Sequence, residues 1–255
     1  MALLALDIGN TRLKWALFDD TNAGSALPSI LSRGAMFLAE VDQLVEREGF
    51  AHSKPSRVIG SHVAGIASRE KIERQFAAIG VGVRWMGATE QACGVTNGYV
   101  DPTRLGTDRW AALIAAKARN LAPCVVVSAG TALTVDQLDE HGNFLGGAIV
   151  AGYHAMLGGL AGNTAALSVD AGDWAAQPKN TRDALATGAI DAMVGAILRG
   201  RDRLLRSLRE RGVSQTPRIV LTGGSAYRLL EHIEGEAVLV DALALEGVYW
   251  LGRNP

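Results

Sequence analysis

The residue types best suited to chemistry first occur near the N-terminus, in the segment Asp7-Ile8-Gly9-Asn10-Thr11-Arg12-Leu13-Lys14. An apolar run ends there in a carboxylate, and a short turn leads into a second apolar run. Backbone N–H groups in such a turn form a concave site for phosphate oxygens, and Gly9 lets the backbone approach a ligand closely. The amide, hydroxyl and ammonium groups of the segment can also bind phosphate. Asp7 can hold Mg²⁺ through water, because Mg²⁺ takes few carboxylates together with substrate phosphates. The alternative is a simple hairpin with Gly-Asn at its tip.

Two later segments have similar residue types. Ser128-Ala129-Gly130-Thr131-Ala132 follows an apolar run, as the first segment does, and Leu221-Thr222-Gly223-Gly224-Ser225-Ala226 lies between an apolar run and a helical pattern. The second segment can bind phosphates from the side opposite the first. The glycines of the third admit a flat base or a ribose beside a helix N-terminus, which favours anions. Each of these segments alone predicts only a tight turn, whereas the three together favour a nucleotide site.

A fourth set of residues suits a second ligand. It consists of Tyr99 and the segment Gly106-Thr107-Asp108-Arg109-Trp110, which begins a predicted helix. A carboxylate beside a helix N-terminus is stabilised as the anion, so Asp108 is expected to stay ionised at neutral pH. Arg109 can bind a substrate carboxylate through two hydrogen bonds. The alternative is a helix cap followed by an exposed arginine.

Elements that would position these residues follow from the hydrophobic pattern. Short apolar runs predict strands, apolar residues at helical spacing predict helices, and their alternation indicates an α/β protein. Residues 3–20 and 124–140 also resemble each other, with Gly9 matching Gly130 and Asp7 matching Ser128. This similarity predicts two duplicated domains, which we place at residues 1–119 and 120–255. The predicted strands are 3–6, 13–18, 57–63, 81–85, 124–127, 133–138 and 218–221, and the predicted helices are 41–48, 69–79, 108–120, 181–212 and 242–252.

Composition excludes several classes of protein. The chain has 255 residues, of which 48% are hydrophobic, and a net charge of −1, which argues against a disordered chain and against a whole-protein nucleic-acid or membrane-surface binder. Its two cysteines form no CxxC pair, which excludes a structural zinc site. So few cysteines in a chain of this length are typical of a reducing compartment, and we expect a cytoplasmic protein without a signal peptide. Residues 145–162, which carry no charge, predict a glycine-rich buried turn region rather than a membrane span. Residues 199–211 contain six arginines and predict a solvated helix face.

The ordered motifs DIGNT, GTDRW, SAGTALTVD followed by LGGAIVAG, and TGG resemble those of type III pantothenate kinases over nearly the full chain. That family belongs to the superfamily of acetate kinase, sugar kinases, Hsp70 and actin. The resemblance therefore implies an α/β fold of two duplicated ribonuclease-H-like (actin-like ATPase) domains with a mixed sheet in each. The first domain would carry the first phosphate loop and part of the substrate site. The second would carry the second phosphate loop and the nucleoside site.

The activity that the resemblance implies is transfer of the ATP γ-phosphoryl group to pantothenate, giving 4'-phosphopantothenate in the first step of coenzyme A synthesis. Carried over by motif, the segment from Asp7 to Lys14 and Thr131 would bind ATP. Gly106, Thr107, Asp108 and Arg109 would bind pantothenate, with Asp108 as the proton acceptor, and Tyr99 and Thr181 would contact the same substrate. Family members are homodimers with the pantothenate pocket near the subunit interface, so Thr181 would act across that interface.

A monovalent cation, K⁺ or NH₄⁺, is also implied by the resemblance. The family commonly has Asp where this chain has Ser128, so a cation here would be held only by carbonyl and hydroxyl oxygens, which argues against K⁺ dependence. Two other functions stay open from the sequence. One is another small-molecule kinase of the same superfamily. The other is a nucleotide-binding transcriptional accessory factor that binds DNA through residues 199–211, which the near-neutral charge disfavours.

Overall fold

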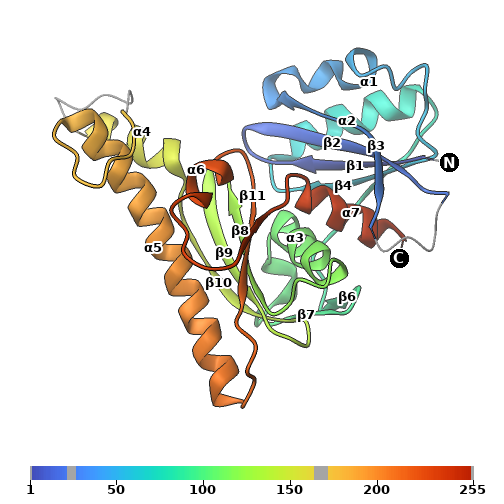
Figure 1. Ribbon diagram of the computed structural model, residues 1–255. Coiled ribbons are helices and arrows are strands. Elements are labelled where there is room, and N and C mark those ends of the chain that lie inside the picture. Colours follow the sequence, from blue (N-terminus) through green and yellow to red (C-terminus); the bar gives the residue numbers. More distant parts are fainter. Residues whose placement is uncertain (1, 22–26, 164–171, 254–255) are drawn as a thin grey trace. The chain divides into compact units, whose positions relative to one another are not determined.

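The computed structural model describes residues 2–21, 27–163 and 172–253 (Figure 1). The chain forms two compact units. One comprises Met1–Asn120 together with Ala242–Pro255, and the other comprises Leu121–Asp241. The prediction of a single second domain over residues 120–255 is therefore wrong for its last stretch, which belongs to the first unit.

The first unit is built on a mixed sheet of β1 (Ala2–Ile8), β2 (Arg12–Asp19), β3 (Ser29–Phe37), β4 (Arg57–His62) and β5 (Val83–Trp85). Their order is β3-β2-β1-β4-β5. Strands β1, β2 and β3 pair antiparallel, whereas β4 runs parallel to both β1 and β5. Because β1 is central, its residues Leu3, Leu4, Ala5 and Leu6 are all fully buried.

Helices cover both faces of this sheet. Successive strand residues point to opposite faces, so Leu4, Leu6 and Ile8 pack with residues of α1 (Leu44–Arg47) and α2 (Ile66–Ala78), while Leu3 lies against α7 (Leu243–Arg253). Figure 1 shows α2 and α7 on the two sides of β1. The remaining elements of the unit are η1 (Leu38–Gln43), the hairpin of β6 (Gln91–Ala92) and β7 (Val95–Asn97), η2 (Pro102–Arg104) and α3 (Thr107–Ala118).

Close packing of α7 on α3 explains why the C-terminal helix belongs to the first unit. A Cβ atom on Gly247 would overlap the carbonyl oxygen of Ala111, so only glycine allows this approach of the two helices. Arg119, next to the end of α3, donates hydrogen bonds of 2.6 and 2.7 Å to the carboxylate of buried Glu246. A buried ion pair with two hydrogen bonds is strongly disrupted when either partner is lost.

The second unit repeats the plan of the first. Its strands are β8 (Cys124–Ala129), β9 (Ala132–Leu138), β10 (Asn143–Ala151), β11 (Arg218–Thr222) and β12 (Ala237–Leu239), in the order β12-β11-β8-β9-β10. Strands β8, β9 and β10 pair antiparallel, and β11 runs parallel to both β8 and β12. Read from β10, this order and these directions match those of the first sheet, as the internal similarity of the sequence predicted.

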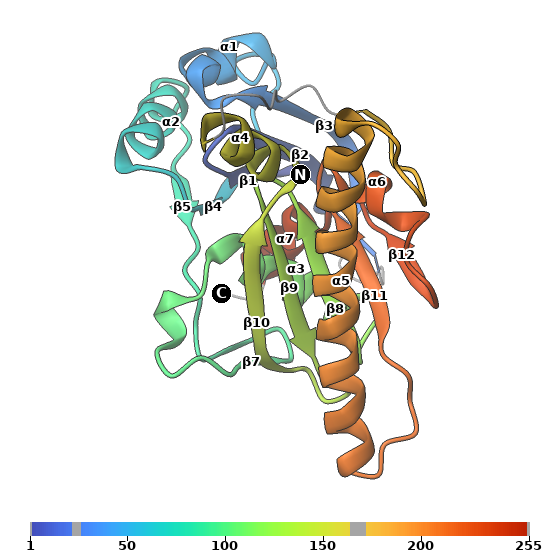
Figure 2. The same ribbon diagram turned by 90° about the vertical axis from the view of Figure 1, so that its left-hand side faces the viewer.

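A long helix, α5 (Thr181–Glu210), packs on the sheet of the second unit, and Figure 2 shows it running along β8, β9 and β10. Its apolar residues, among them Ile190, Met193 and Ile197, form a core with alternate residues of β8 and β9. A Cβ on Gly200 would overlap the side chain of Val135 on β9, so glycine lets the helix lie close to the strand there. The unit also contains α4 (Tyr153–Asn163) and α6 (Ala226–Leu230).

Two segment predictions are wrong. Residues 145–162 are not a buried turn region: they form most of β10 and α4, and Leu145, Ile149 and Leu160 are 44%, 61% and 45% exposed. A register shift between Phe144 and Gly146, where Gly146 has a φ of +119°, accommodates one of the glycines within the strand. The predicted helix 41–48 is a 3₁₀ helix followed by a single α-helical turn. Among the described residues, no helix is long and apolar enough to cross a membrane.

Candidate active site

Asp7 lies near the end of β1 with a polar residue on each neighbouring strand. It pairs in register with Lys14 on β2 and with Ser61 on β4. Residues in register on adjacent strands project from the same face of the sheet, so the carboxylate, the ammonium group and the hydroxyl form one polar row. Asp7 Oδ1 is buried and has no hydrogen-bond partner within the described part of the chain. The sheet therefore carries an unsatisfied carboxylate oxygen beside a positive charge.

A second carboxylate acts on this row. Burial, and after it the negative charge of Asp108, raise the pKa of Asp7 from its ordinary value of 3.8 to about 6, while Lys14 and Ser61 lower it. Asp7 and Asp108 are 101 positions apart in sequence, yet both belong to the first unit and are close enough to repel each other. Two carboxylates this close repel each other when both are ionised. A divalent cation near one of them, or a hydroxyl that donates a hydrogen bond to the other, would reduce this repulsion.

The turn after β1 has the form that the sequence predicted. Gly9 N donates to Arg12 O at 3.0 Å, and Leu38 N donates to Thr11 O at 3.0 Å. Asn10, Thr11 and Arg12 are exposed. The Arg12 guanidinium lies 4.5 Å from the centre of the Phe37 ring. Ile8 and Leu13 are fully buried. Of the nine residues predicted to bind ATP, these two can therefore contribute only their backbone groups.

The start of α3 is anchored to the end of β4. The Thr107 hydroxyl lies 2.9 Å from Ser61 Oγ and accepts a 3.1 Å hydrogen bond from His62 N. Next along the helix, Asp108 Oδ1 accepts a 2.9 Å hydrogen bond from Arg109 N. A Cβ on Gly106 would lie 2.7 Å from Asp108 Oδ1, so glycine leaves room for the carboxylate. Thr107 and Asp108 are thus held beside the row of Asp7.

The side chains of Tyr99 and Arg109, both predicted to bind substrate, contact each other. Arg109 Nη1 donates a 2.8 Å hydrogen bond to Tyr99 Oη. Arg109 is only 5% exposed, so the alternative of an exposed arginine after a helix cap is wrong. Asn97 was not predicted: its Oδ1 accepts from Tyr99 N at 3.1 Å, and its Nδ2 donates to the carbonyl oxygens of Thr89 and Pro102. Asn97 therefore fixes the loop that presents Tyr99.

The turn after β8 in the second unit is the counterpart of the turn after β1. Gly130 N donates to Ala132 O at 2.9 Å, and two other segments bind the same turn, through Gly152 N to Thr131 O and Ser225 N to Ala129 O, both at 3.0 Å. A Cβ on Gly152 or on Gly223 would overlap backbone atoms of this turn. The predicted phosphate and nucleoside segments of this unit thus come together around exposed Thr131.

Ser128 occupies the position in the second sheet that Asp7 occupies in the first. Its neighbours in register are Thr134 on β9 and Thr222 on β11. Thr134 Oγ1 is buried without a hydrogen-bond partner among the residues that the structure describes. In residues 2–21, 27–163 and 172–253, no group of three or more His, Cys, Asp or Glu side chains could hold a metal ion. The row offers hydroxyl oxygens only.

Thr181, the remaining predicted site residue, lies exposed at the first position of α5 in the second unit. The Asn180 side chain caps this helix by accepting a 2.9 Å hydrogen bond from Asp183 N. None of the residues predicted to bind substrate belongs to this unit except Thr181.

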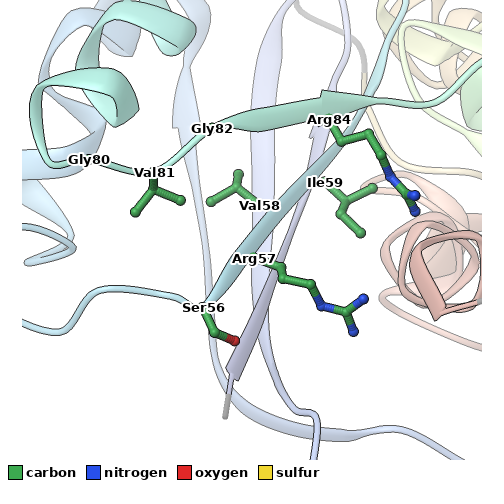
Figure 3. A pocket seen from close by; sticks show the side chains of 8 residues that line it. All are labelled: Ser56, Arg57, Val58, Ile59, Gly80, Val81, Gly82 and Arg84. Carbon is green, nitrogen blue, oxygen red and sulfur yellow. The ribbon is translucent and has the colours of Figure 1, made fainter.

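A pocket of about 320 Å³ lies along β4 and β5, and no predicted site residue lines it (Figure 3). The guanidinium groups of Arg57 and Arg84 point to the same side of the pocket in Figure 3. Arg57 donates to Gly252 O, and Arg84 donates to Leu251 O and Gly252 O. Arginines at the last carbonyls of a helix stabilise that helix end, so we assign this pair to the capping of α7. The predicted site residues Asp7 and Thr107 lie at the other end of β4, beside Ser61.

The family description of type III pantothenate kinase matches residues 3–204. The chain belongs to this family. A type III pantothenate kinase from Methylibium petroleiphilum is 43% identical to it over 97% of this chain and 97% of the relative. Another, from Polaromonas sp., is 40% identical over 97% of this chain and 96% of the relative. The chain is therefore a kinase, as its motifs predicted.

A solved structure supports the fold. A protein from Sinorhizobium meliloti, provisionally named a 2-dehydro-3-deoxygalactonokinase, matches with a TM-score of 0.57 and 14% identity, over 98% of each chain. At that identity the likeness concerns the fold alone. It confirms the predicted α/β fold with two mixed sheets.

Proposed function

We propose that the protein transfers the γ-phosphoryl group of ATP to the primary hydroxyl of pantothenate, giving 4'-phosphopantothenate in the first step of coenzyme A synthesis. The observation that carries this proposal is the grouping of Asp7, Asp108 and the Tyr99–Arg109 pair in one unit, with Asp7 at the turn after β1. One carboxylate faces the phosphate loop, and the other lies beside groups suited to an acidic, hydroxyl-bearing substrate.

The nucleotide end of the site would consist of the turn from Asp7 to Lys14 and of Thr131. Backbone N–H groups of the two turns and the Lys14 ammonium group suit the phosphates. Asp7 Oδ1, buried and without a hydrogen-bond partner among the described residues, fits a water ligand of Mg²⁺. Magnesium, when bound, neutralises charge on the β- and γ-phosphates. Gly152 and Gly223 keep the turn at Thr131 free of side-chain atoms.

The acceptor end would consist of Tyr99, Gly106, Thr107, Asp108 and Arg109. Arg109 is held by Tyr99 and suits the pantothenate carboxylate. Asp108 would accept a hydrogen bond from the primary hydroxyl and orient its oxygen toward the γ-phosphorus. It would take the hydroxyl proton as the new O–P bond forms and the bond from the γ-phosphorus to the bridging oxygen breaks, with ADP as the leaving group. Phosphoryl transfer passes through a loose transition state, so positioning and charge neutralisation supply most of the rate.

Subunit assembly and cation use belong to the same proposal. We expect a homodimer in which Thr181 of one subunit contributes to the pantothenate site of the other. A K⁺ or NH₄⁺ ion would be bound at Ser128 by hydroxyl and carbonyl oxygens alone, with Thr134 Oγ1 as a further oxygen. Since no carboxylate is present in that row, binding would be weak, and activity should change little between K⁺, NH₄⁺ and Na⁺ salts. We expect the reaction to take place in the cytoplasm.

The decisive experiment is a kinase assay with labelled ATP, Mg²⁺ and a panel of acceptors that contains pantothenate, several sugars and sugar acids. Formation of 4'-phosphopantothenate in preference to the other products supports the proposal. Turnover of a sugar or sugar acid alone would assign the chain a different kinase activity. A DNA-binding titration at several salt concentrations tests the remaining candidate, for which the binding constant would fall steeply with salt.

A further inference from the structure

The hydroxyl of Ser61 occupies an unusual position between the two acids of the site. Ser61 is 1% exposed and lies on β4 in register with Asp7. Its Oγ is 2.9 Å from the hydroxyl of Thr107, the residue before Asp108. Ser61 itself belongs to none of the motifs. Its hydroxyl joins β4 to the start of α3.

The hydroxyls of Ser61 and Thr107 belong to one group of hydrogen bonds at the end of β4. His62 N–H donates to Thr107 Oγ1 at 3.1 Å. A hydroxyl has a single proton, and Thr107 has two acceptors for its own: Ser61 Oγ at 2.9 Å and, farther away, His62 O at 3.4 Å. The Ser61 hydroxyl also lowers the pKa of the neighbouring Asp7 carboxyl. The end of β4 is thereby linked to Asp7 and, through the Thr107 hydroxyl, to the residue before Asp108.

We propose that Ser61 is a positioning residue for phosphoryl transfer, which holds Thr107 and thereby fixes Asp108 beside Asp7. The inference rests on the proposed function, because it assigns Ser61 a part in aligning the groups of that reaction. Asp108 occupies the first turn of α3, where helix ends fray most readily. Anchoring the preceding residue to a buried serine at the end of β4 removes that freedom. Misplacement of a catalytic group by about 1 Å costs up to about 100-fold in rate.

Ser68 provides a matched control. It is also a buried serine of the first unit, at 8% exposure, and its hydroxyl donates a 2.7 Å hydrogen bond to Gly65 O at the start of α2. It also lies 3.2 Å from His62 Nε2. Ser68 therefore has hydrogen bonds comparable in number to those of Ser61, but none to Thr107 or to the acids. If a buried hydroxyl matters only for folding, the two substitutions should affect the enzyme alike.

The test compares Ser61→Ala, Ser68→Ala, Thr107→Ser, Thr107→Val and the double variant Ser61→Ala/Thr107→Val in steady-state kinetics with pantothenate and ATP. We expect Ser61→Ala to lower kcat about 10-fold with both KM values within about 2-fold, Ser68→Ala to leave kcat unchanged, and Thr107→Ser to retain most activity. The double variant should be no slower than Thr107→Val, since both changes remove one interaction. Urea unfolding of each variant separates loss of folded protein from loss of alignment.

Either of two results would overturn the inference while leaving the proposed function intact: kcat of Ser61→Ala equal to that of the wild type, or losses that multiply in the double variant. An equal loss of kcat in Ser61→Ala and Ser68→Ala would also reject it, because stability alone would then explain both. A wild-type protein that does not phosphorylate pantothenate would instead refute the proposed function, and the positioning role with it.

Discussion

Replacing Asp7 with Asn should stabilise the folded protein at neutral pH while removing activity. Asp7 has a buried oxygen without a hydrogen-bond partner among the described residues, and the charge of Asp108 repels it. The protein keeps an ionised carboxylate in a place where its own fold disfavours the charge. Asparagine has almost the same shape and no charge, so it avoids the desolvation of a buried charge and the repulsion by Asp108. Active-site residues are commonly retained at the expense of stability.

The size of the effect follows from the pKa of Asp7, which rises from 3.8 to about 6 in the folded protein. One pH unit corresponds to about 1.4 kcal/mol, so the rise corresponds to at most about 3 kcal/mol. Asp7 is half-buried, and solvent screening reduces the expected gain to about 1–2 kcal/mol. The folded state holds the Asp7 proton more tightly than the unfolded state does. The wild type therefore loses stability as the pH rises from about 4 to above 6, and below the unfolded pKa the penalty is absent.

Urea unfolding without nucleotide or Mg²⁺ measures this directly, at about pH 7.5 and at about pH 4. Asp7→Asn should be more stable than the wild type at the higher pH and equal to it at the lower one. Asp42→Asn is the control, because Asp42 is an exposed carboxylate of the same unit that forms a surface ion pair with Lys71. It should change stability by at most about 1 kcal/mol at both pH values. An Asp7→Asn protein that is destabilised at pH 7.5, or equally stabilised at both, contradicts the reasoning.

Three further predictions concern single side chains. Asp108→Asn should lower kcat by roughly 100-fold or more, as loss of a general base does. Its urea midpoint should be no lower than that of the wild type, because the repulsion of Asp7 is removed, and wild-type turnover would reject its role. Gly152→Ala should weaken ATP binding at least about 10-fold in calorimetry, because its Cβ would overlap the turn after β8. Gly158→Ala is the control and should bind ATP normally, because a Cβ there has no neighbour within 4 Å. Gly247→Ala should lower the free energy of unfolding in urea by about 3 kcal/mol or more, because its Cβ would force α7 away from α3. Gly195→Ala, in open space on α5, should leave that free energy unchanged or raise it by up to about 1 kcal/mol. Equal urea midpoints for the two variants would contradict this prediction.

Much of the fold could be predicted because the local signals and the tertiary structure agree. The apolar runs that became β1 and β8 are buried on both faces, and a continuous run is the pattern that such a strand needs. Helix α5 was predicted almost to its observed ends because apolar residues recur at helical spacing up to Leu208. Strand β3 was missed because it pairs only with β2 and is mostly exposed, so its sequence SILSRGAMF has no apolar alternation. The prediction of a turn region at residues 145–162 was wrong because it relied on their many glycines. Pairing with β9 makes the first part of this segment a strand.

Residues of the candidate site could be proposed from the sequence where they belong to contiguous motifs, but not where strand register brings them together. Asp7, Lys14, Asp108 and Arg109 belong to recognisable motifs. Ser61 lies in RVIGSH, which has no motif, and only the parallel pairing of β4 with β1 brings it beside Asp7. Asn97 was not predicted either, although an asparagine side chain commonly fixes a turn by accepting a hydrogen bond from the backbone two residues later, as Asn97 does from Tyr99 N. Register is a long-range property, so neither residue gives a local signal.

Because the chain leaves its first unit after Asn120 and re-enters it at Ala242, the second unit is an insertion into the first. Leu121–Asp241 is one uninterrupted stretch and can be excised and expressed by a pair of cuts. The first unit cannot be obtained by truncation, because a chain stopped at Asn120 would lack α7 and leave Arg119 without its carboxylate. Nor would it be complete during synthesis until the last residues emerge, so the inserted unit has the opportunity to fold before its host.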